Sequence, residues 1–403
     1  MTSPSPNLSV GPTIRRYRQQ KGDRSVASVA GLCGITPRYL HMIEEGKKVP
    51  SLDVLDRIAA VLGVSLAALL AGDPIDRPSP PVSVAPAVAR ALLGSTREPG
   101  PGAVDAARLR ERVEWAWQTS KDRFTQAAGN LPGLITDVED AVRRHRYGHD
   151  AQARREVLRV AADLYGLLRS YCRRVGRLDL ALLVADRAMQ AAEEADDPVR
   201  RAAASWNLGH VLLSHNEPDA VEEAKEIALQ AVEDLRTLPA STASQAVEGA
   251  LELVAVVSDA RRCDWPQARR RLEQRALPLA RTAGEGNIQW TVFGPTNVAL
   301  HAMSIEMLAG EAAEGLRLAD RVDTSRLPSR ERQFTFGLEV ARCYNLRRDD
   351  AAVLVHLLSL EDLAPEDLSR SPVARTMVQE LQLRVRPAFR RKVDALASRL
   401  QLA

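Results

Sequence analysis

Long amphipathic patterns fill the chain from Val104 onward, with apolar residues recurring at the three- and four-residue spacing of an α-helix. No stretch in this region has the convincing alternation of apolar and polar residues that a strand requires. We therefore expect residues 104–403 to be all-α. The apolar stretches are short and interrupted by charged residues, and none approaches the ~20 residues of a membrane-spanning helix. We expect no membrane partner.

Five turn-plus-helix segments repeat within this region. They begin at Gly176, Asn216, Cys263, Gly310 and Arg348, at intervals of 40, 47, 47 and 38 residues. Each follows a long amphipathic stretch, so the repeating unit is a helix, a turn and a second helix. Periods of this size are typical of an α-solenoid, in which stacked neighbours bury the apolar face of each helix pair. An irregular helical bundle with coincidental spacing is the alternative.

The first repeat resembles the tetratricopeptide (TPR) repeat. Gly176, Ala181, Ala185 and Ala188 have the small-residue spacing that lets two paired helices pack closely. Trp206, Leu208 and Gly209 resemble the first-helix signature of that family with one residue missing. Because the observed period exceeds the roughly 34 residues of a standard TPR, the resemblance implies a degenerate, TPR-like solenoid.

Short helical patterns separated by turn signals fill residues 11–72. They predict five helices, the first over Thr13–Gln20 and the last with Leu66, Leu69 and Leu70 facing inward. The expected N-terminal caps are Ser25, Thr36 followed by Pro37, and Ser51. Residues 1–10 are expected to be a disordered lead. Residues 73–103 are expected to be a proline-rich linker with one short helix at Val88–Leu93.

The second and third of these helices, joined by a turn at Gly34, form a helix-turn-helix pattern. Residues 11–72 as a whole resemble the XRE (Cro/CI, lambda-repressor-like) family of bacterial DNA-binding domains. The resemblance is carried by Ala30, Gly34, Ile35, Thr36, Tyr39, Leu40, Ile43, Glu44, Gly46, Pro50, Ser51, Leu55, Ala59, Gly63, Val64 and Leu69. One position departs from the family pattern, because Val26 stands where the family usually carries a phosphate-gripping Gln. That departure implies fewer phosphate contacts.

The resemblance implies that the third helix enters the major groove of double-stranded DNA. Arg38 is then the expected base reader, since its guanidinium matches guanine O6 and N7. Pro37 or Met42 would touch a thymine methyl, and Lys47 and Lys48 would meet phosphates. The expected DNA contacts are Thr36, Pro37, Arg38, Tyr39, His41, Met42, Lys47 and Lys48. Two alternatives stay open: a packed role for the Tyr39 ring, and a module that contacts only protein.

The distribution of charge agrees with an anionic partner for the N-terminal part. Residues 1–72 hold nine Lys and Arg against five Asp and Glu, although the formal net charge of the whole 403-residue chain is only +3. A small basic module is therefore attached to a nearly neutral body. A chance surplus of charge on a solvated surface explains the same numbers.

Patterns that would indicate catalysis or metal binding are missing from the sequence. There is no glycine-rich phosphate loop, no nucleophile elbow and no HExxH motif. The four cysteines lie far apart without a CxxC pair, which is typical of a reducing cytoplasm. The N-terminus lacks a secretory signal pattern. We expect a cytoplasmic protein that is not an enzyme and has no cofactor and no metal.

A DNA-binding module, a linker and a TPR-like body together resemble the peptide-sensing quorum regulators of bacteria. The resemblance implies a peptide or small-molecule effector in the groove lined by the first helix of each pair. Expected ligand contacts are Trp206, His210, Trp290, Thr296, Asn297 and Arg342. Gly294–Pro295 either kinks a helix and directs Thr296 and Asn297 into the groove, or simply separates two helices.

Three hypotheses about the whole chain follow. The first is a sequence-specific transcription regulator that binds an operator as a homodimer, because one small helix-turn-helix covers only half of a two-fold site. The second is a protein-interaction regulator whose solenoid captures a protein partner, with DNA binding as a tether. The third is a constitutive repressor without a ligand.

Overall fold

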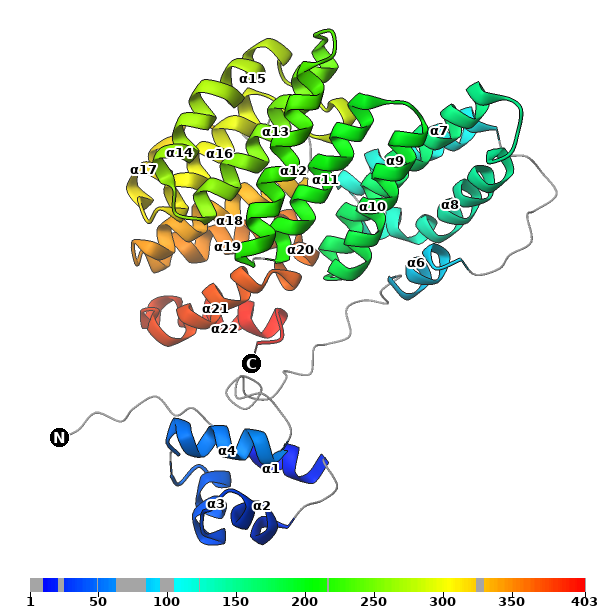
Figure 1. Ribbon diagram of the computed structural model, residues 1–403. Coiled ribbons are helices and arrows are strands. Elements are labelled where there is room, and N and C mark those ends of the chain that lie inside the picture. The colour runs from blue at the N-terminus through cyan, green and yellow to red at the C-terminus, as the bar shows by residue number, and fades with distance from the viewer. Residues whose placement is uncertain are drawn as a thin grey trace. The chain divides into compact units, whose positions relative to one another are not determined.

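The computed structural model of the chain describes residues 10–20, 25–48, 50–62, 85–94, 105–122, 124–215, 217–323 and 330–402. The chain divides into two compact units, Met1–Val82 and Ser83–Ala403. All regular secondary structure within the described residues is helical (Figure 1). The all-α prediction is therefore confirmed for this part of the chain.

Four short helices form the described part of the first unit. They are α1 (Val10–Gln20), α2 (Val26–Leu32), α3 (Pro37–Glu44) and α4 (Leu52–Leu62). Their inward faces make one apolar core, in which Ile14, Leu40 and Ile58 are completely buried. The fifth predicted helix, with Leu66, Leu69 and Leu70, lies outside the described residues.

The predicted capping residues cap these helices. The Ser25 hydroxyl accepts a hydrogen bond from the Ser28 N–H at 3.1 Å, and the Thr36 hydroxyl accepts one from the Tyr39 N–H at 3.2 Å. Pro37 occupies the first turn of α3, where a missing N–H costs nothing. Gly34 takes a left-handed φ of 65° in the turn between α2 and α3, a conformation that glycine adopts without strain.

The start of α1 differs from the sequence prediction. The helix begins at Val10 rather than Thr13, and the Val10 side chain is buried in the core of the unit. Gly11 is the physical reason, because a Cβ at that position would lie 2.2 Å from the Ile43 carbonyl oxygen. The glycine lets the first turn of α1 lie directly against the end of α3. Residue 10 therefore belongs to the folded module and not to a lead.

A buried ion pair joins α1 to α3. Arg18 is 9% exposed and Glu44 is 6% exposed. The Arg18 Nε and Nη2 donate to the two carboxylate oxygens of Glu44 at 2.8 and 3.0 Å. This two-point geometry resists rotation as well as separation. It therefore sets the orientation of α3 within the unit.

Helical hairpins make up most of the second unit. Its helices are α6 (Ala85–Leu92), α7 (Ala106–Asp122), α8 (Phe124–His145), α9 (Ala151–Arg174), α10 (Leu178–Glu194), α11 (Pro198–His215), α12 (Pro218–Arg236), α13 (Thr242–Arg261), α14 (Trp265–Arg271), the π-helical η1 (Leu272–Ala276), α15 (Leu277–Ala283), the one-turn η2 (Ile288–Trp290), α16 (Pro295–Leu308), α17 (Ala312–Ala319), α18 (Arg330–Leu346), α19 (Asp350–Leu363), α20 (Pro365–Arg370), α21 (Pro372–Arg384) and α22 (Pro387–Arg399).

The five predicted repeats are five of these hairpins. Helices α9, α11, α13, α16 and α18 each pack against the helix that follows, and α11 also packs against α9, α10 and α13 (Figure 1). The small residues have the predicted role, since Ala181, Ala185 and Ala188 are buried where α10 meets α9. Stacked hairpins rather than an irregular bundle therefore form the body, and the TPR-like solenoid prediction is confirmed.

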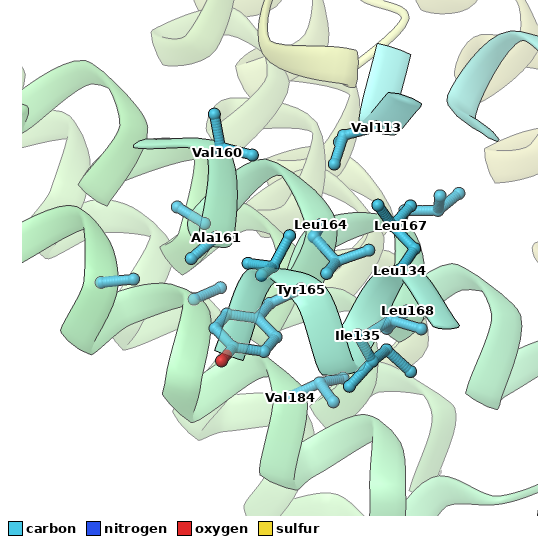
Figure 2. Close-up of a cluster of buried hydrophobic side chains, with 14 of the residues drawn as sticks. Val113, Leu134, Ile135, Val160, Ala161, Leu164, Tyr165, Leu167, Leu168 and Val184 are labelled. Atoms are coloured by element: carbon cyan, nitrogen blue, oxygen red, sulfur yellow. The ribbon is translucent and has the colours of Figure 1, made fainter. Parts of the chain in front are cut away.

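The apolar core of the first hairpins is continuous. Figure 2 shows side chains of α7, α8, α9 and α10 packed together, among them Val113, Ile135, Leu164 and Val184. Helix α6 joins this core through Val88 and Leu92. The segment predicted as a linker thus contributes a helix to the second unit, because its two apolar residues are four positions apart and lie on one face.

Two long-range ion pairs close the second unit on itself. The Arg174 Nη2 donates to the two carboxylate oxygens of Asp367 at 2.7 and 2.8 Å, across a separation of 193 residues. Arg173 pairs with Glu331, across 158 residues. These contacts join α9 to α18 and α20. The last hairpins therefore return to the first ones instead of extending away from them.

The segment before α16 decides between the two interpretations of Gly294–Pro295. Helix α16 starts at Pro295, so the pair separates two helices rather than kinking one. The preceding loop is anchored by Phe293, which packs on Gly249 of α13. A Cβ on Gly249 would lie 2.0 Å from the Phe293 ring.

None of the helices within the described residues is both long enough and apolar enough to cross a membrane.

Replacing Glu44 by Gln removes one charge of the buried pair and should destabilise the first unit by about 3–5 kcal/mol. Hydrogen-exchange mass spectrometry on peptides from residues 10–62 of the full chain would measure the change. Glu45→Gln is the matched control, since it removes the same charge at an exposed neighbouring position. Equal exchange rates in the two variants would contradict a structural role for the pair.

Replacing Gly249 by Ala should destabilise the second unit, although Ala is the better helix former by about 1 kcal/mol. The added methyl group overlaps the Phe293 ring, and overpacking of this kind costs about 1–3 kcal/mol. Gly129→Ala in α8 is the control, because nothing lies within 4 Å of its Cβ position. Denaturant unfolding followed by circular dichroism should show a lower midpoint for Gly249→Ala only.

Candidate functional site

The outer face of α3 carries the residues predicted to contact DNA. Thr36, Pro37, Arg38 and His41 are exposed, and Met42 is half-buried. The opposite face, with Leu40 and Ile43, is fully buried. An eight-residue helix with one buried and one exposed face presents a narrow row of side chains at a fixed angle. Such a row has the dimensions needed to enter a DNA major groove.

The two predicted phosphate contacts lie just beyond the end of α3. Gly46 takes a φ of 70°, which turns the chain back so that the N–H groups of Lys47 and Lys48 both donate to the Met42 carbonyl. This helix ending places two exposed lysines beside the row on α3. The positions of both side chains therefore follow from the glycine.

Glu45 lies between two of these groups. Its carboxylate is 2.9 Å from the Lys47 Nζ and 3.2 Å from the His41 Nε2. The hydrogen bond from Lys47 and the nearby positive charges lower the pKa of Glu45. All three side chains are solvent-exposed to a third or more, so Lys47 is free to exchange this partner for a phosphate at little cost.

Tyr39 and Val26 are both half-buried and pack against the apolar core of the unit. The ring of Tyr39 therefore packs against the unit, which is the alternative role considered for it from the sequence. Val26 is the first residue of α2 and has an apolar side chain. The hydroxyl of the preceding Ser25 caps the helix.

The second candidate site is a cavity of about 180 Å³ inside the second unit. It is bounded by α7, α8, α9, α11, the loop before α16, and α18. The lining residues are Trp117, Ser120, Ala128, Leu131, Leu167, Arg169, Ser170, Tyr171, Arg173, Arg174, Trp206, His210, Asn287, Trp290, Val292, Glu331, Arg332 and Thr335. Closure of the unit by α18 gives the cavity its last wall.

Four arginines and one glutamate line this cavity. Arg173 pairs with the glutamate, Glu331, and Arg174 pairs with Asp367. Although burial acts to raise the pKa of Glu331, the arginines around it hold that pKa below its usual range. Burial lowers the pKa of Arg332. The lining therefore carries more basic than acidic side chains.

Arg169 is the most buried of these arginines, with 5% of its surface exposed. Its Nε donates to the Asn207 Oδ1 at 2.8 Å, and its guanidinium lies 5.1 Å from the centre of the Trp206 ring. Burial and then repulsion from Arg173 lower its pKa to about 9. Its partners are thus a neutral amide and an aromatic ring.

His210 extends this aromatic wall. Its ring meets the Trp206 ring edge-on, with the ring centroids 4.6 Å apart. Burial, followed by repulsion from Arg169 and Arg332, holds the pKa of His210 well below its ordinary value. The imidazole is therefore neutral at physiological pH.

Two stacked indoles form another wall. The rings of Trp117 and Trp290 are nearly parallel, at 3°, with centroids 4.9 Å apart. Trp290 belongs to a loop in which three non-glycine residues, Gln289, Trp290 and Val292, have left-handed φ values of 49°, 61° and 56°. Each such residue costs on the order of 1–3 kcal/mol. Buried Thr291 and Phe293 hold the loop in this strained form.

The predicted ligand contacts divide into two groups. Trp206, His210 and Trp290 line the cavity, whereas Thr296, Asn297 and Arg342 do not. The N–H and the hydroxyl of Thr296 both donate to Glu285, so this residue fastens the start of α16. Asn297 is buried in α16, and its Oδ1 has no hydrogen-bond partner among the described residues. Thr296 and Asn297 were predicted to enter the groove through a helix kink that the chain does not form there, since α16 begins at Pro295. Arg342 was predicted from the repeat register, and it does not line this cavity.

Sequence reasoning missed Trp117 and the arginines of α9 and α18. Arginines occur throughout the chain, and those of α9 have no spacing that sets them apart from solvent-facing ones. Trp117 lies before the first recognised repeat, so no repeat register pointed to it. Only closure of the unit brings these side chains to one place.

Comparison with known proteins agrees with the first of these two sites. Residues 14–69 match the sequence profile of the helix-turn-helix family. No curated protein sequence matches the chain.

Two solved structures are similar at low identity. One is PlcR of Bacillus thuringiensis in complex with the peptide PapR7 and DNA, at 10% identity and a TM-score of 0.28, covering 89% of this chain and 99% of PlcR. The other is the apo form of ComR from S. thermophilus, at 14% identity and a TM-score of 0.27, covering 86% of this chain and 99% of ComR. With TM-scores this low, neither structure bears on the function of this chain.

The profile match and the geometry of α2 and α3 agree over the same residues. Residues 14–69 are a helix-turn-helix domain of the XRE type, which this chain carries ahead of a TPR-like helical body.

Proposed function

We propose that the protein is a sequence-specific transcription regulator that acts in the cytoplasm, reads an operator with α3 and senses a small molecule or peptide in its TPR-like body. The observation that carries the proposal is the exposed row Pro37, Arg38 and His41 on a helix whose other face is completely buried. A row with Arg at its start suits bidentate reading of a guanine edge. Lys47 and Lys48 beyond the helix end suit phosphate contacts.

The buried Arg18–Glu44 pair supports the same function. Base reading requires that side chains reach the groove at a fixed angle, and a two-point ion pair between α1 and α3 supplies that stiffness. The pair contributes nothing to base contacts itself. It acts as a positioning device for Arg38 and its neighbours.

The cavity of the second unit supports a sensing role. It combines a surplus of positive charge, two aromatic walls and a strained loop, and such features occur together at ligand sites. Its walls come from helices far apart in the sequence, so an occupant would contact α9 and α18 at once. A ligand changes DNA binding only if it binds one arrangement of these helices more tightly than another.

Dimerisation is part of the proposal because one small helix-turn-helix covers only half of a two-fold operator. The rival function is a protein-interaction regulator in which the body captures a protein and DNA binding is a tether. Purified protein whose DNA binding responds to a small molecule or short peptide favours the sensor. A response only to a second protein favours the rival.

Selection of bound sites from random duplex DNA by the purified full chain should yield a two-fold symmetric motif. We expect half-sites about 34–36 Å apart, or a multiple of that distance, because a dimer places its two reading helices on one face of the duplex. Enrichment of a single half-site would contradict the dimer. No enriched motif at any salt concentration would contradict sequence-specific reading.

Arg38→Ala and Lys47→Ala should weaken DNA binding in different ways. Loss of Arg38 should cost about 1–3 kcal/mol at the selected site and relax the preference at one base pair. Loss of Lys47 should weaken all sequences alike and lower the slope of log K against log salt by about one. Fluorescence anisotropy at several salt concentrations measures both effects, with Arg155→Ala in α9 as the control for net charge. Identical profiles for the two variants would show that the docking assignment is wrong.

A further inference from the structure

The Arg169 guanidinium is a buried positive charge without a carboxylate partner among the described residues. It is 5% exposed, and it bonds to the Asn207 amide oxygen. Buried charges in proteins are usually paired, since the loss of hydration is otherwise uncompensated. By contrast, Arg173 and Arg174 on the same helix each have an acidic partner. Arg169 is thus the lining arginine of α9 that has no directly paired carboxylate among the described residues, although the charge of Glu331 acts on it from a distance.

The surroundings of Arg169 add a flat apolar surface. Trp206 lies beneath its guanidinium, and the stacked Trp117 and Trp290 rings form another part of the same cavity wall. Leu131 and Leu167 complete the apolar lining. A molecule in this cavity therefore meets several aromatic rings and four arginines, of which Arg169 is the most buried. Glu331, the acidic residue of the lining, is paired with Arg173.

The size of the cavity limits its occupant. The cavity volume is about 180 Å³. This volume is below the ~300 Å³ at which drug-sized ligand pockets begin. This space holds one compact group, so a longer molecule would place only one end or one side group in it.

We infer that the cavity binds an organic carboxylate attached to a ring or a short apolar group, with the carboxylate on Arg169 and the apolar part against the tryptophans. The carboxylate supplies the negative counter-charge that Arg169 lacks. It would accept from the guanidinium N–H groups that do not already donate to the Asn207 Oδ1. The source is a free small molecule or the C-terminal residue of a longer chain that enters only with its end. This inference rests on the proposed sensing function and specifies the chemistry of its ligand.

Phenylacetate and phenylacetamide form a matched pair of probes, since they share size and ring and differ in charge. Titration of the full chain, followed by calorimetry and tryptophan fluorescence, should give saturable binding of phenylacetate with a Kd of about 1 mM or tighter. The amide should bind at least about tenfold more weakly, which corresponds to about 1.4 kcal/mol. Equal affinity of acid and amide, or no saturable signal with the acid, would overturn the inference.

Variants locate the binding site. Arg169→Met keeps an unbranched apolar stem and removes the guanidinium with its charge, so the preference for the acid over the amide should disappear. Arg155→Met, at an exposed position of the same helix, should leave that preference unchanged. If Arg169→Met fails to fold by circular dichroism, the comparison of acid and amide on the unaltered protein still decides the matter.

Two further arms separate the source of the carboxylate from the proposed function. A heptapeptide ending in Phe, with a free or an amidated C-terminus, reports whether a chain end enters the cavity. If only the free-acid peptide competes with phenylacetate, the site accepts a chain end, and if neither peptide competes, it accepts a free small molecule. Site selection on random DNA tests the regulator independently, so failure of carboxylate binding with intact DNA binding would refute the inference alone.

Discussion

Closure of the helical body by Arg174–Asp367 and Arg173–Glu331 is the interaction on which the rest of the second unit depends. A solenoid held only by contacts between neighbouring repeats is open and offers a concave groove. Here α18 and α20 contact α9, so side chains of α7, α9 and α18 share one cavity. Because Arg174 and Asp367 are largely buried, their attraction is little screened and their geometry is well defined.

The interior that this closure creates is locally unfavourable. It gathers guanidinium groups that repel one another, a histidine that burial keeps neutral, and a loop with three strained residues. The apolar cores on either side offset this unfavourable free energy. Small residues such as Ala181 and Ala185 let the helices of these cores pack closely. Strained or electrostatically unfavourable groups that the surrounding structure holds in place are typical of functional sites.

The first unit uses the same principle at a smaller scale. Helix α3, which we propose reads DNA, is short, and helices of this length are not stable on their own. Apolar burial of Leu40 and Ile43, the Thr36 cap and the Arg18–Glu44 pair together hold it. Because these buried contacts fix the position of α3, its exposed face can carry charged side chains. Both units therefore present polar chemistry on elements whose position is set by buried contacts.

Local signals in the sequence determined the helices and the repeats. Caps at Ser25, Thr36 and Ser51, helical periodicity and the small-residue faces act over a few residues, so they can be read directly. Trp206 and His210 were found through the repeat register, which is also a local rule. Tertiary structure alone decided the closure, the start of α16 at Pro295 and the convergence of Arg169, Trp117 and Trp290. These depend on contacts between residues up to 193 positions apart, and a charge or ring that meets its partner at that distance has no signature in its own neighbourhood.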